Sequence, residues 1–229
     1  MSTTPLWLHD APPPLPPAVG DLKCDVVVIG AGLCGTSATL SLAEAGVDAI
    51  QLEAGTAASG ATGRNAGFIL QGTAERYDRA VGVMGRARAR RVHEWSLENH
   101  RRLRHAIERH QIECDYRQNG SIQLASSPSE ARALEASAAL LVADGFSAQL
   151  LAANQLPESL QAAGYKRALV LPEDGELHPA RLAQHAGQAA IQLGARRFDQ
   201  SPVLALDAER PGHATVRNPQ ATVSADLVL

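Results

Sequence analysis

Residues 25–35, with the sequence DVVVIGAGLCG, constrain the fold of this chain more than any other segment. A short apolar run precedes Gly30, Gly32 and Gly35, and an alanine-rich stretch compatible with a helix follows them. A second apolar run then ends at Glu53. This order predicts a strand, a glycine-rich turn, a helix and a parallel strand, which is the repeating unit of an α/β fold.

The three glycines have separate roles in a turn that binds a dinucleotide. The first allows the tight turn, the second lets a pyrophosphate approach the backbone, and the third lets the helix pack closely on the strand. Glu53 stands 18 residues after Gly35, where its carboxylate can accept both hydroxyls of an adenosine ribose and would repel a 2′-phosphate. The sequence therefore favours FAD or NAD over NADP. Glycines that only pack a helix, with an incidental glutamate, are the less favoured alternative.

Residues 54–72 have neither helical nor strand periodicity, and a loop of this length is often functional. Within them, SGATGRNAGF at residues 59–68 contains three glycines that let the backbone pass close to a flat ligand. Arg64 and Asn65 add a cation and an amide. Such a loop suits a flavin better than NAD.

These motifs resemble the D-amino-acid-oxidase-like (DAO) superfamily of FAD-dependent oxidoreductases, in which a Gly-Arg-Asn-(Gly/Ala)-Gly segment follows the ribose-binding glutamate. Residues 174–206 resemble the segment that returns into the flavin domain of this family. The N-terminal PLWLHDAP is similar to that of γ-glutamylputrescine oxidase-type members, and the chain as a whole is most similar to members of the γ-glutamylputrescine oxidase and glycine oxidase types. The resemblance covers about residues 6–229 and implies FAD as the cofactor. Ala66 is a small departure, because many relatives have glycine there.

The resemblance also implies which residues contact FAD. Gly30, Gly32, Leu33 and Gly35 would hold the pyrophosphate, Glu53 and Ala54 the ribose end, Thr62, Arg64, Asn65, Ala66 and Gly67 the ribityl chain and flavin ring, and the Val203 backbone the adenine. No catalytic side chain and no metal ligand is assigned.

The fold that the resemblance implies is α/β: a Rossmann-like FAD-binding domain of the glutathione-reductase type with part of an α+β substrate domain. We expect an extended proline-rich arm over residues 1–22, the first part of the FAD-binding domain over 23–85, a helical and hairpin insertion of the substrate or cap domain over 86–172, and a return to the FAD-binding domain over 173–229. The regular fold is expected to begin near Lys23. Because the closing ATVSADLVL has the pattern of an unfinished strand, we expect the chain to be truncated at its C-terminus.

Local patterns predict the remaining elements. Apolar spacing indicates a helix over residues 86–110 that buries Val92, Trp95, Leu103, Ala106 and Ile107. Asn119-Gly120 predicts the turn of a hairpin over residues 114–125. Further helices are expected over 128–144, 157–163 and 179–193, and strands over 168–171 and near 196, 203, 214 and 222.

Several side chains admit two interpretations. The eight arginines of residues 86–109 alternate with glutamates, which favours a solvated helix face over a nucleic-acid or metal site. Cys34 lies in the first turn of the predicted helix and is interpreted as a packing residue rather than a redox-active thiol. His178 precedes a proline that starts a helix, so it either orients an amine or caps the helix. Phe68, Tyr116 and Tyr165 are candidates for the wall of a pocket.

Composition narrows the possible partners and the location. The net charge of −3 gives no basic field for nucleic acid, and no apolar run reaches the roughly 20 residues of a membrane span. The three cysteines are widely spaced and predict no disulfide framework. The N-terminus lacks the pattern of a secretory signal, so a cytoplasmic location is expected.

The resemblance implies transfer of a hydride to the flavin from the carbon that bears the neutral amine of a small-molecule amine or amino acid. The product would be an imine, and oxygen or another electron acceptor would reoxidise the flavin. One alternative is a non-catalytic FAD-binding fragment of such an enzyme. A less favoured alternative is an NAD-dependent dehydrogenase, which would lack the flavin-type loop after Glu53.

Overall fold

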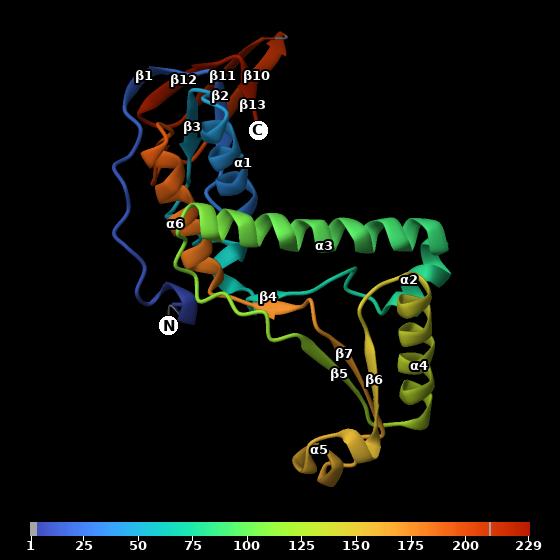
Figure 1. Ribbon diagram of the computed structural model, residues 1–229. Helices are drawn as coiled ribbons and strands as arrows, with labels where there is room; N and C mark the ends of the chain where they lie inside the picture. The colour runs from blue at the N-terminus through green and yellow to red at the C-terminus, as the bar shows by residue number, and fades with distance from the viewer. Residues whose placement is uncertain (1–3, 211) are drawn as a thin grey trace. The chain divides into compact units, whose positions relative to one another are not determined.

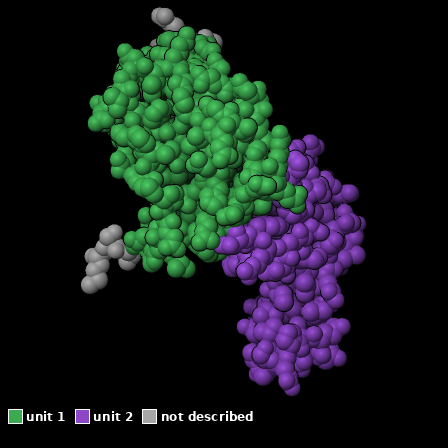
Figure 2. All heavy atoms as spheres, turned by 60° about the vertical axis from the view of Figure 1, so that its left-hand side comes forward, with its two compact units in different colours: residues 1–67, 107–114, 178–229 green, residues 68–106, 115–177 purple. Residues whose placement is uncertain are grey.

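The computed structural model describes residues 4–210 and 212–229, which form two compact units (Figure 2). The first unit holds the chain up to Gly67, then Ile107–Cys114 and His178–Leu229, and the second holds Phe68–Ala106 and Asp115–Leu177. The chain thus leaves the first unit after Gly67, returns to it over Ile107–Cys114 and again from His178, whereas the sequence predicts domain boundaries at 85 and 172. The assignment of a cofactor domain and a substrate domain stays a prediction.

A parallel sheet with the order β13-β2-β3-β9 forms the centre of the first unit (Figure 1). Its strands are β13 (Leu227–Val228), β2 (Val26–Ile29), β3 (Ala49–Leu52) and β9 (Arg196–Phe198). Helix α1 (Leu33–Glu44) connects β2 to β3 and packs against α6 (Pro179–Gln192). The predicted strand, helix and parallel strand around the glycine turn are confirmed.

A second sheet of the first unit packs against the parallel one. Its order is β1-β12-β11-β10, with β1 (Gly20–Lys23), β12 (Ala221–Ala225), β11 (His213–Arg217) and β10 (Ala205–Arg210). Buried side chains of both sheets, among them Val27, Ile50, Val216 and Val223, share one core. Alternate residues of β2 and β3 therefore face this core, and the others face α1.

The N-terminal segment is more ordered than the sequence predicts. The expected start of the fold near Lys23 is wrong, because Gly20–Lys23 pairs in parallel with β12 and Ala18 is already fully buried. A short 3-10 helix, η1 (Leu6–Leu8), precedes the extended proline-rich stretch. The strand expected near residue 203 begins only at Ala205.

The second unit contains an antiparallel sheet and several helices. The sheet has the order β5-β7-β6, with β5 (Ser121–Ala125), β7 (Arg167–Leu171) and β6 (Gln149–Ala152). The helices are α2 (Tyr77–Met84), α3 (Arg86–Arg109, which ends in the first unit), α4 (Pro128–Ala143) and α5 (Glu158–Ala162), with a 3-10 turn η3 (Ala153–Gln155). Two short strands, β4 (Phe68–Ile69) and β8 (Gly175–Glu176), pair with each other. Helix α4 begins with a capping box of Ser127 and Glu130 and packs on the sheet.

The hairpin predicted around Asn119-Gly120 is wrong, because β5 pairs with β7 and not with the residues before the turn. A two-residue turn of the primed type needs positive φ at both central positions. Gly120 has φ of +73°, but Asn119 is not among the positive-φ residues of the described chain. The Gly120 N–H instead donates to the Asp174 carbonyl, and Arg117 forms a bridge with Glu176.

Helix α3 has nearly the predicted extent, and Val92, Leu103, Ala106 and Ile107 are half-buried, but its most buried residues are not those predicted. Trp95 was expected in the core and is 61% exposed, with the Arg91 guanidinium 5.1 Å from its ring centroid. The buried residues are Ala89, His93 and His100. The arginines of the helix are solvated as predicted, and several form exposed pairs with glutamates, such as Arg90 with Glu94. Helix α2 and strand β6 were not predicted.

Candidate cofactor-binding site

The turn between β2 and α1 depends on glycine at two positions. Gly30 follows β2 with φ of +100°, a conformation that residues with a side chain rarely adopt. Gly35 lies in the first turn of α1, and a Cβ at this position would collide with the Gly30 carbonyl oxygen. The helix therefore begins against the end of the strand, and its first N–H groups lie beside the turn.

Glu53 follows β3 and is held beside this turn by two backbone donors. Its Oε2 accepts from the Ala31 N–H at 2.6 Å, and its Oε1 accepts from the Gly55 N–H at 2.8 Å. Each carboxylate oxygen retains a second acceptor position, because an ionised carboxylate offers about four. The side chain is thus fixed in orientation and still able to accept hydroxyl donors.

A second loop, residues 59–67, contacts the glycine turn directly. It contains the 3-10 helix η2 (Ala61–Arg64), and Thr62 Oγ1 accepts from the Leu33 N–H at 2.9 Å. A Cβ on Gly32 would lie 3.2 Å from the same hydroxyl oxygen. The structure therefore brings Thr62 together with Gly32 and Leu33, which are 29 or more positions away in the sequence.

Asn65 shapes the end of this loop. Its Oδ1 accepts from the Gly67 N–H at 2.8 Å, and its Nδ2 donates to the Thr62 carbonyl at 2.9 Å. Arg64 is exposed and donates through Nε to the Ser59 carbonyl at 3.2 Å, and Ala66 is also exposed. The amide thus maintains the loop, and the guanidinium remains accessible to a ligand.

Val203 lies on a segment that runs beside Glu53. The Ser201 N–H donates to the Glu53 carbonyl at 2.7 Å, and the Gln200 N–H donates to the Gly55 carbonyl at 2.8 Å. Val203 itself packs, half-buried, against the core of the first unit. Exposed Ala54 lies between Glu53 and Gly55 in the chain.

Sequence reasoning missed two residues that support this site. Gln51 is buried in β3, and its Nε2 donates to the Gly30 carbonyl at 3.0 Å. A single amide within the apolar run AIQL was the signal that would have found it. Trp7 donates from its indole N–H to the Asn65 carbonyl at 2.7 Å, and nothing in the local sequence around Trp7 indicates this contact.

Two open interpretations can be compared with the geometry. His178 Nδ1 accepts from the Arg181 N–H at 3.1 Å, so the imidazole caps α6. A role in orienting an amine stays a prediction. Cys34 is exposed in the first turn of α1.

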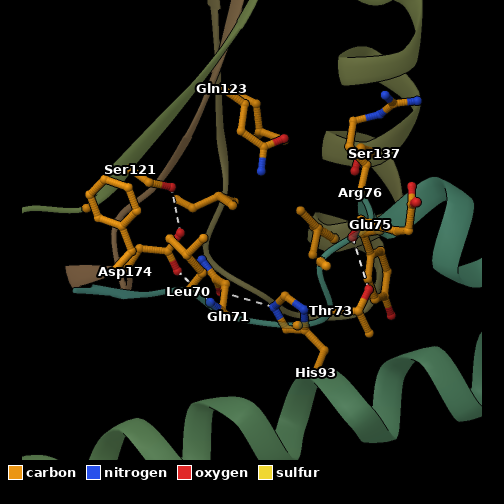
Figure 3. A pocket seen from close by; sticks show the side chains of 18 of the residues that line it. Leu70, Gln71, Thr73, Glu75, Arg76, His93, Ser121, Gln123, Ser137 and Asp174 are labelled. Carbon is orange, nitrogen blue, oxygen red and sulfur yellow. Dashed lines mark hydrogen bonds between the residues drawn. The ribbon is translucent and has the colours of Figure 1, made fainter. Parts of the chain in front are cut away.

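The second unit contains a cavity of about 550 Å³ (Figure 3). Gln71 lies at its wall, where its N–H donates to Asp174 Oδ1 at 2.8 Å and its Oε1 lies 3.0 Å from His93 Nε2. The Ser121 hydroxyl donates to Asp174 Oδ2 at 2.5 Å. Of the three aromatic residues expected near a pocket, Phe68 lines the cavity, whereas Tyr116 and Tyr165 are not among its lining residues.

His93 is uncharged near neutral pH, because burial, with a smaller contribution from His100, lowers its pKa to about 4. Its ring contacts the rings of Tyr77 and Phe146, with centroid distances of 5.2 and 4.2 Å. The Tyr77 hydroxyl donates to Asp144 at 2.7 Å. Burial, together with this hydrogen bond, raises the pKa of Tyr77.

The residues of the first unit fit a dinucleotide in both shape and chemistry. Gly30 and Gly32 leave the turn without side chains, so an anionic group can approach the start of α1. Glu53 supplies a fixed acceptor at the end of the adjacent strand.

Within residues 4–210 and 212–229, no group of three or more His, Cys, Asp and Glu is arranged to hold a metal ion. Over the same residues, none of the helices combines the length and apolarity that crossing a membrane requires.

Known proteins match almost the whole chain. Gamma-glutamylputrescine oxidoreductase of Escherichia coli (strain K12) is 32% identical over 209 residues, which are 91% of this chain and 48% of that protein. Probable oxidoreductase OrdL of Haemophilus influenzae is 30% identical over 216 residues, which are 93% of this chain and 50% of that protein. The chain thus spans about half the length of the curated relatives it matches.

Solved structures with low sequence identity share the fold. Glycine oxidase from Geobacillus kaustophilus has a TM-score of 0.72 at 23% identity, and the match covers 90% of this chain and 54% of the glycine oxidase chain. L-Amino acid deaminase from Proteus myxofaciens has a TM-score of 0.73 at 16% identity, and the match covers 95% of this chain and 48% of the deaminase chain. The family model described as "FAD dependent oxidoreductase" (DAO) matches residues 25–229. The chain therefore belongs to the DAO family of FAD-dependent oxidoreductases, which confirms the family, the mixed α/β fold and the FAD cofactor expected from the sequence.

Proposed function

We propose that this chain carries the FAD-binding part of an enzyme that oxidises the C–N bond of a small-molecule amine or amino acid to an imine. The observation that carries this proposal is the 2.9 Å hydrogen bond from the Leu33 N–H to Thr62 Oγ1. This hydrogen bond joins the glycine turn (residues 30–35) to the flavin-type loop (residues 59–67), so the two motifs form one continuous surface. A dinucleotide that carries a flat ring system has one part for each motif: its pyrophosphate for the glycine turn and its ring for the loop.

Each part of the surface has a proposed contact with FAD. Gly30, Gly32, Leu33 and Gly35 hold the pyrophosphate, Glu53 and Ala54 the ribose end, Thr62, Arg64, Asn65, Ala66 and Gly67 the ribityl chain and ring, and Val203 the adenine. Bound FAD supplies the acceptor for the hydride that leaves the amine-bearing carbon. The residues of the chain fix the ring in place, and the exposed Arg64 guanidinium provides positive charge at the loop.

The relatives support an amine or amino acid as the substrate class, because their names refer to γ-glutamylputrescine, glycine and L-amino acids. The oxidation removes a hydride from carbon and a proton from nitrogen, and water then hydrolyses the imine. Oxygen or another electron acceptor regenerates the oxidised cofactor. A second candidate is a FAD-binding unit without turnover, which is favoured by the fact that the chain spans about half of its curated relatives.

The test is reconstitution of the purified protein with FAD, followed by anaerobic addition of glycine, sarcosine or γ-glutamylputrescine. We expect a visible flavin band that one of these amines bleaches. A band that no amine bleaches supports the FAD-binding unit without turnover. A protein that retains no FAD contradicts the proposed function of this chain.

Glu53→Gln is a useful variant, because it removes the negative charge while keeping most of the side-chain volume. It should weaken FAD binding about tenfold, as expected for a lost charge-assisted hydrogen bond.

A further inference from the structure

The N-terminal turn η1 touches the flavin-type loop. Trp7 lies in η1, and its indole N–H donates to the Asn65 carbonyl oxygen at 2.7 Å across 58 positions of sequence. The indole nitrogen can only donate, so this hydrogen bond requires the Asn65 carbonyl oxygen to point at the indole N–H. The contact therefore fixes the orientation of the peptide group between Asn65 and Ala66.

The orientation of this peptide has a consequence on its other side. In a trans peptide, the C=O and the following N–H point in opposite directions. No cis peptide occurs in the described part of the chain. With the Asn65 carbonyl directed at Trp7, the Ala66 N–H points away from η1. Ala66 is exposed, so this donor is presented on the outer side of the loop.

Apolar packing holds η1 in place. Trp7 and Leu8 pack against a small buried cluster of Ala58, Ala180 and Ala183. A Cβ on Gly63 would lie 3.0 Å from Leu8 Cδ2, so the loop and the turn already touch closely at Gly63. The contact of η1 with the loop therefore does not depend on one hydrogen bond alone.

Trp7 also contacts the start of α6. Its ring meets the His178 imidazole edge-on, with centroids 4.7 Å apart. His178 is held in turn, because its Nδ1 accepts from the Arg181 N–H. One indole thus contacts the flavin-type loop on one side and the capped end of a long helix on the other.

The segment that follows η1 is fastened along its length. The Leu15 N–H donates to Asp199 Oδ2 at 2.9 Å, and the Ala18 N–H donates to Ser201 Oγ at 2.9 Å. The chain then enters β1, which pairs with β12. Because these anchors lie on core segments of the first unit, the position of Trp7 is set by the sheet and not only by the loop that it contacts.

We propose that Trp7 is a positioning residue for FAD: it holds residues 61–67 in their binding shape and turns the Ala66 N–H outward as a donor to the flavin ring. This inference rests on the proposed function, which assigns the loop to the flavin. Ordering the loop before the cofactor arrives lowers the conformational cost of binding. The N-terminal arm thereby acts on the cofactor through Asn65.

Two variants and a matched control test this inference. Trp7→Phe keeps an aromatic ring against His178 but removes the N–H, and Trp7→Ala removes both. Trp95→Phe is the control, because Trp95 is 61% exposed on α3 of the second unit. Hydrogen exchange of the apoprotein is measured by mass spectrometry on peptides covering residues 58–67 and on peptides of β2 and β3. The dissociation constant of FAD is measured for the same proteins.

We expect Trp7→Phe to speed exchange in residues 58–67 and to weaken FAD binding, each about tenfold, which is the size expected for one lost hydrogen bond. Trp7→Ala should have a larger effect, and Trp95→Phe should change neither quantity. The inference is overturned if Trp7→Phe exchanges like the wild type, or if β2 and β3 lose protection to the same extent as the loop. If the wild type binds no FAD, the proposed function fails, and the exchange data still decide whether Trp7 orders the loop.

Discussion

The two units place their buried polar groups in different ways. Around the glycine turn of the first unit, side chains bond mainly to nearby backbone, as Gln51 does with Gly30 and Glu53 with Ala31 and Gly55. In the second unit, side chains from distant segments bond to one another, as in the pair of Tyr77 and Asp144. The first arrangement depends on backbone shape and the second on side-chain pairing. Substitutions should therefore affect the two units through different mechanisms.

The largest effect is expected where backbone shape is most constrained. Gly35→Ala places a methyl group against the Gly30 carbonyl oxygen, so the turn or the start of α1 must shift. We expect a loss of about 3 kcal/mol in the free energy of unfolding and loss of measurable FAD binding. Urea denaturation and FAD titration are the measurements.

The matched control is Gly82→Ala in α2. A Cβ there meets no atom within 4 Å, and alanine favours a helix, so we expect a gain of up to about 1 kcal/mol. Equal destabilisation by the two substitutions would show that the close approach at Gly35 is not what constrains the turn.

The next largest effect tests a buried carboxylate that joins distant segments of the second unit. Asp174→Ala removes the acceptors of the Gln71 N–H and the Ser121 hydroxyl, and Asp174 is 1% exposed. We expect destabilisation by about 2–3 kcal/mol, because buried donors are left without partners. Asp174→Asn keeps one carbonyl acceptor and should lose roughly half as much. The measurement is thermal denaturation of both variants. An Asp174→Ala variant that unfolds at the same temperature as the wild type would refute this account.

Acid should weaken the second unit through His93. Its folded pKa of about 4 lies below the usual 6.5, so the unfolded chain binds a proton more readily as the pH falls. The stabilisation is fully present above pH 6.5 and is lost as the pH falls toward 4. Between pH 7 and pH 5 we expect a loss of about 2 kcal/mol, measured by urea denaturation.

A comparison of two histidines on α3 isolates this contribution. His93→Gln should lose the corresponding part of the pH dependence, whereas His105→Gln should retain it, because His105 is exposed. Identical pH profiles for the wild type and His93→Gln would contradict the assignment to His93.

The smallest effect is expected on the surface of α3. Arg90 and Glu94 form a pair at 3.0 Å, with both side chains about half exposed. We expect Arg90→Ala to change the free energy of unfolding by less than about 0.5 kcal/mol. A measured loss above about 1 kcal/mol would mean that this pair belongs to a larger network.

The contrast between the units also explains what the sequence predicts well. Gly30 and Gly35 stand at a fixed spacing because a strand, a turn and a helix impose it, and Glu53 is found by its place at the end of the next strand. No such spacing links Gln71 with His93 or Ser121 with Asp174, because tertiary packing alone brings these side chains together.

Two local errors in the second unit have the same cause. Asn119-Gly120 has the composition of a hairpin turn, but strand β7, more than 40 positions later, pairs with β5 in place of the preceding residues. On α3, hydrophobicity favoured burial of Trp95, whereas the helix buries His93 and His100. Local propensity gave no information about which surface each element would meet.

The strand pairing also determines the order in which the molecule can assemble during synthesis. The three-stranded sheet is complete once residue 171 has been made, because β5, β6 and β7 are close in sequence. By contrast, β1 must wait for β12, since Gly20 pairs with Ala221, and β2 must wait for β13. Closing such long loops is slow, so the apolar faces of β2 and β3 remain unprotected until β12 and β13 have been made. Residues 20–52 should therefore depend on chaperones during synthesis more strongly than residues 121–171, whose strand partners are made soon after one another.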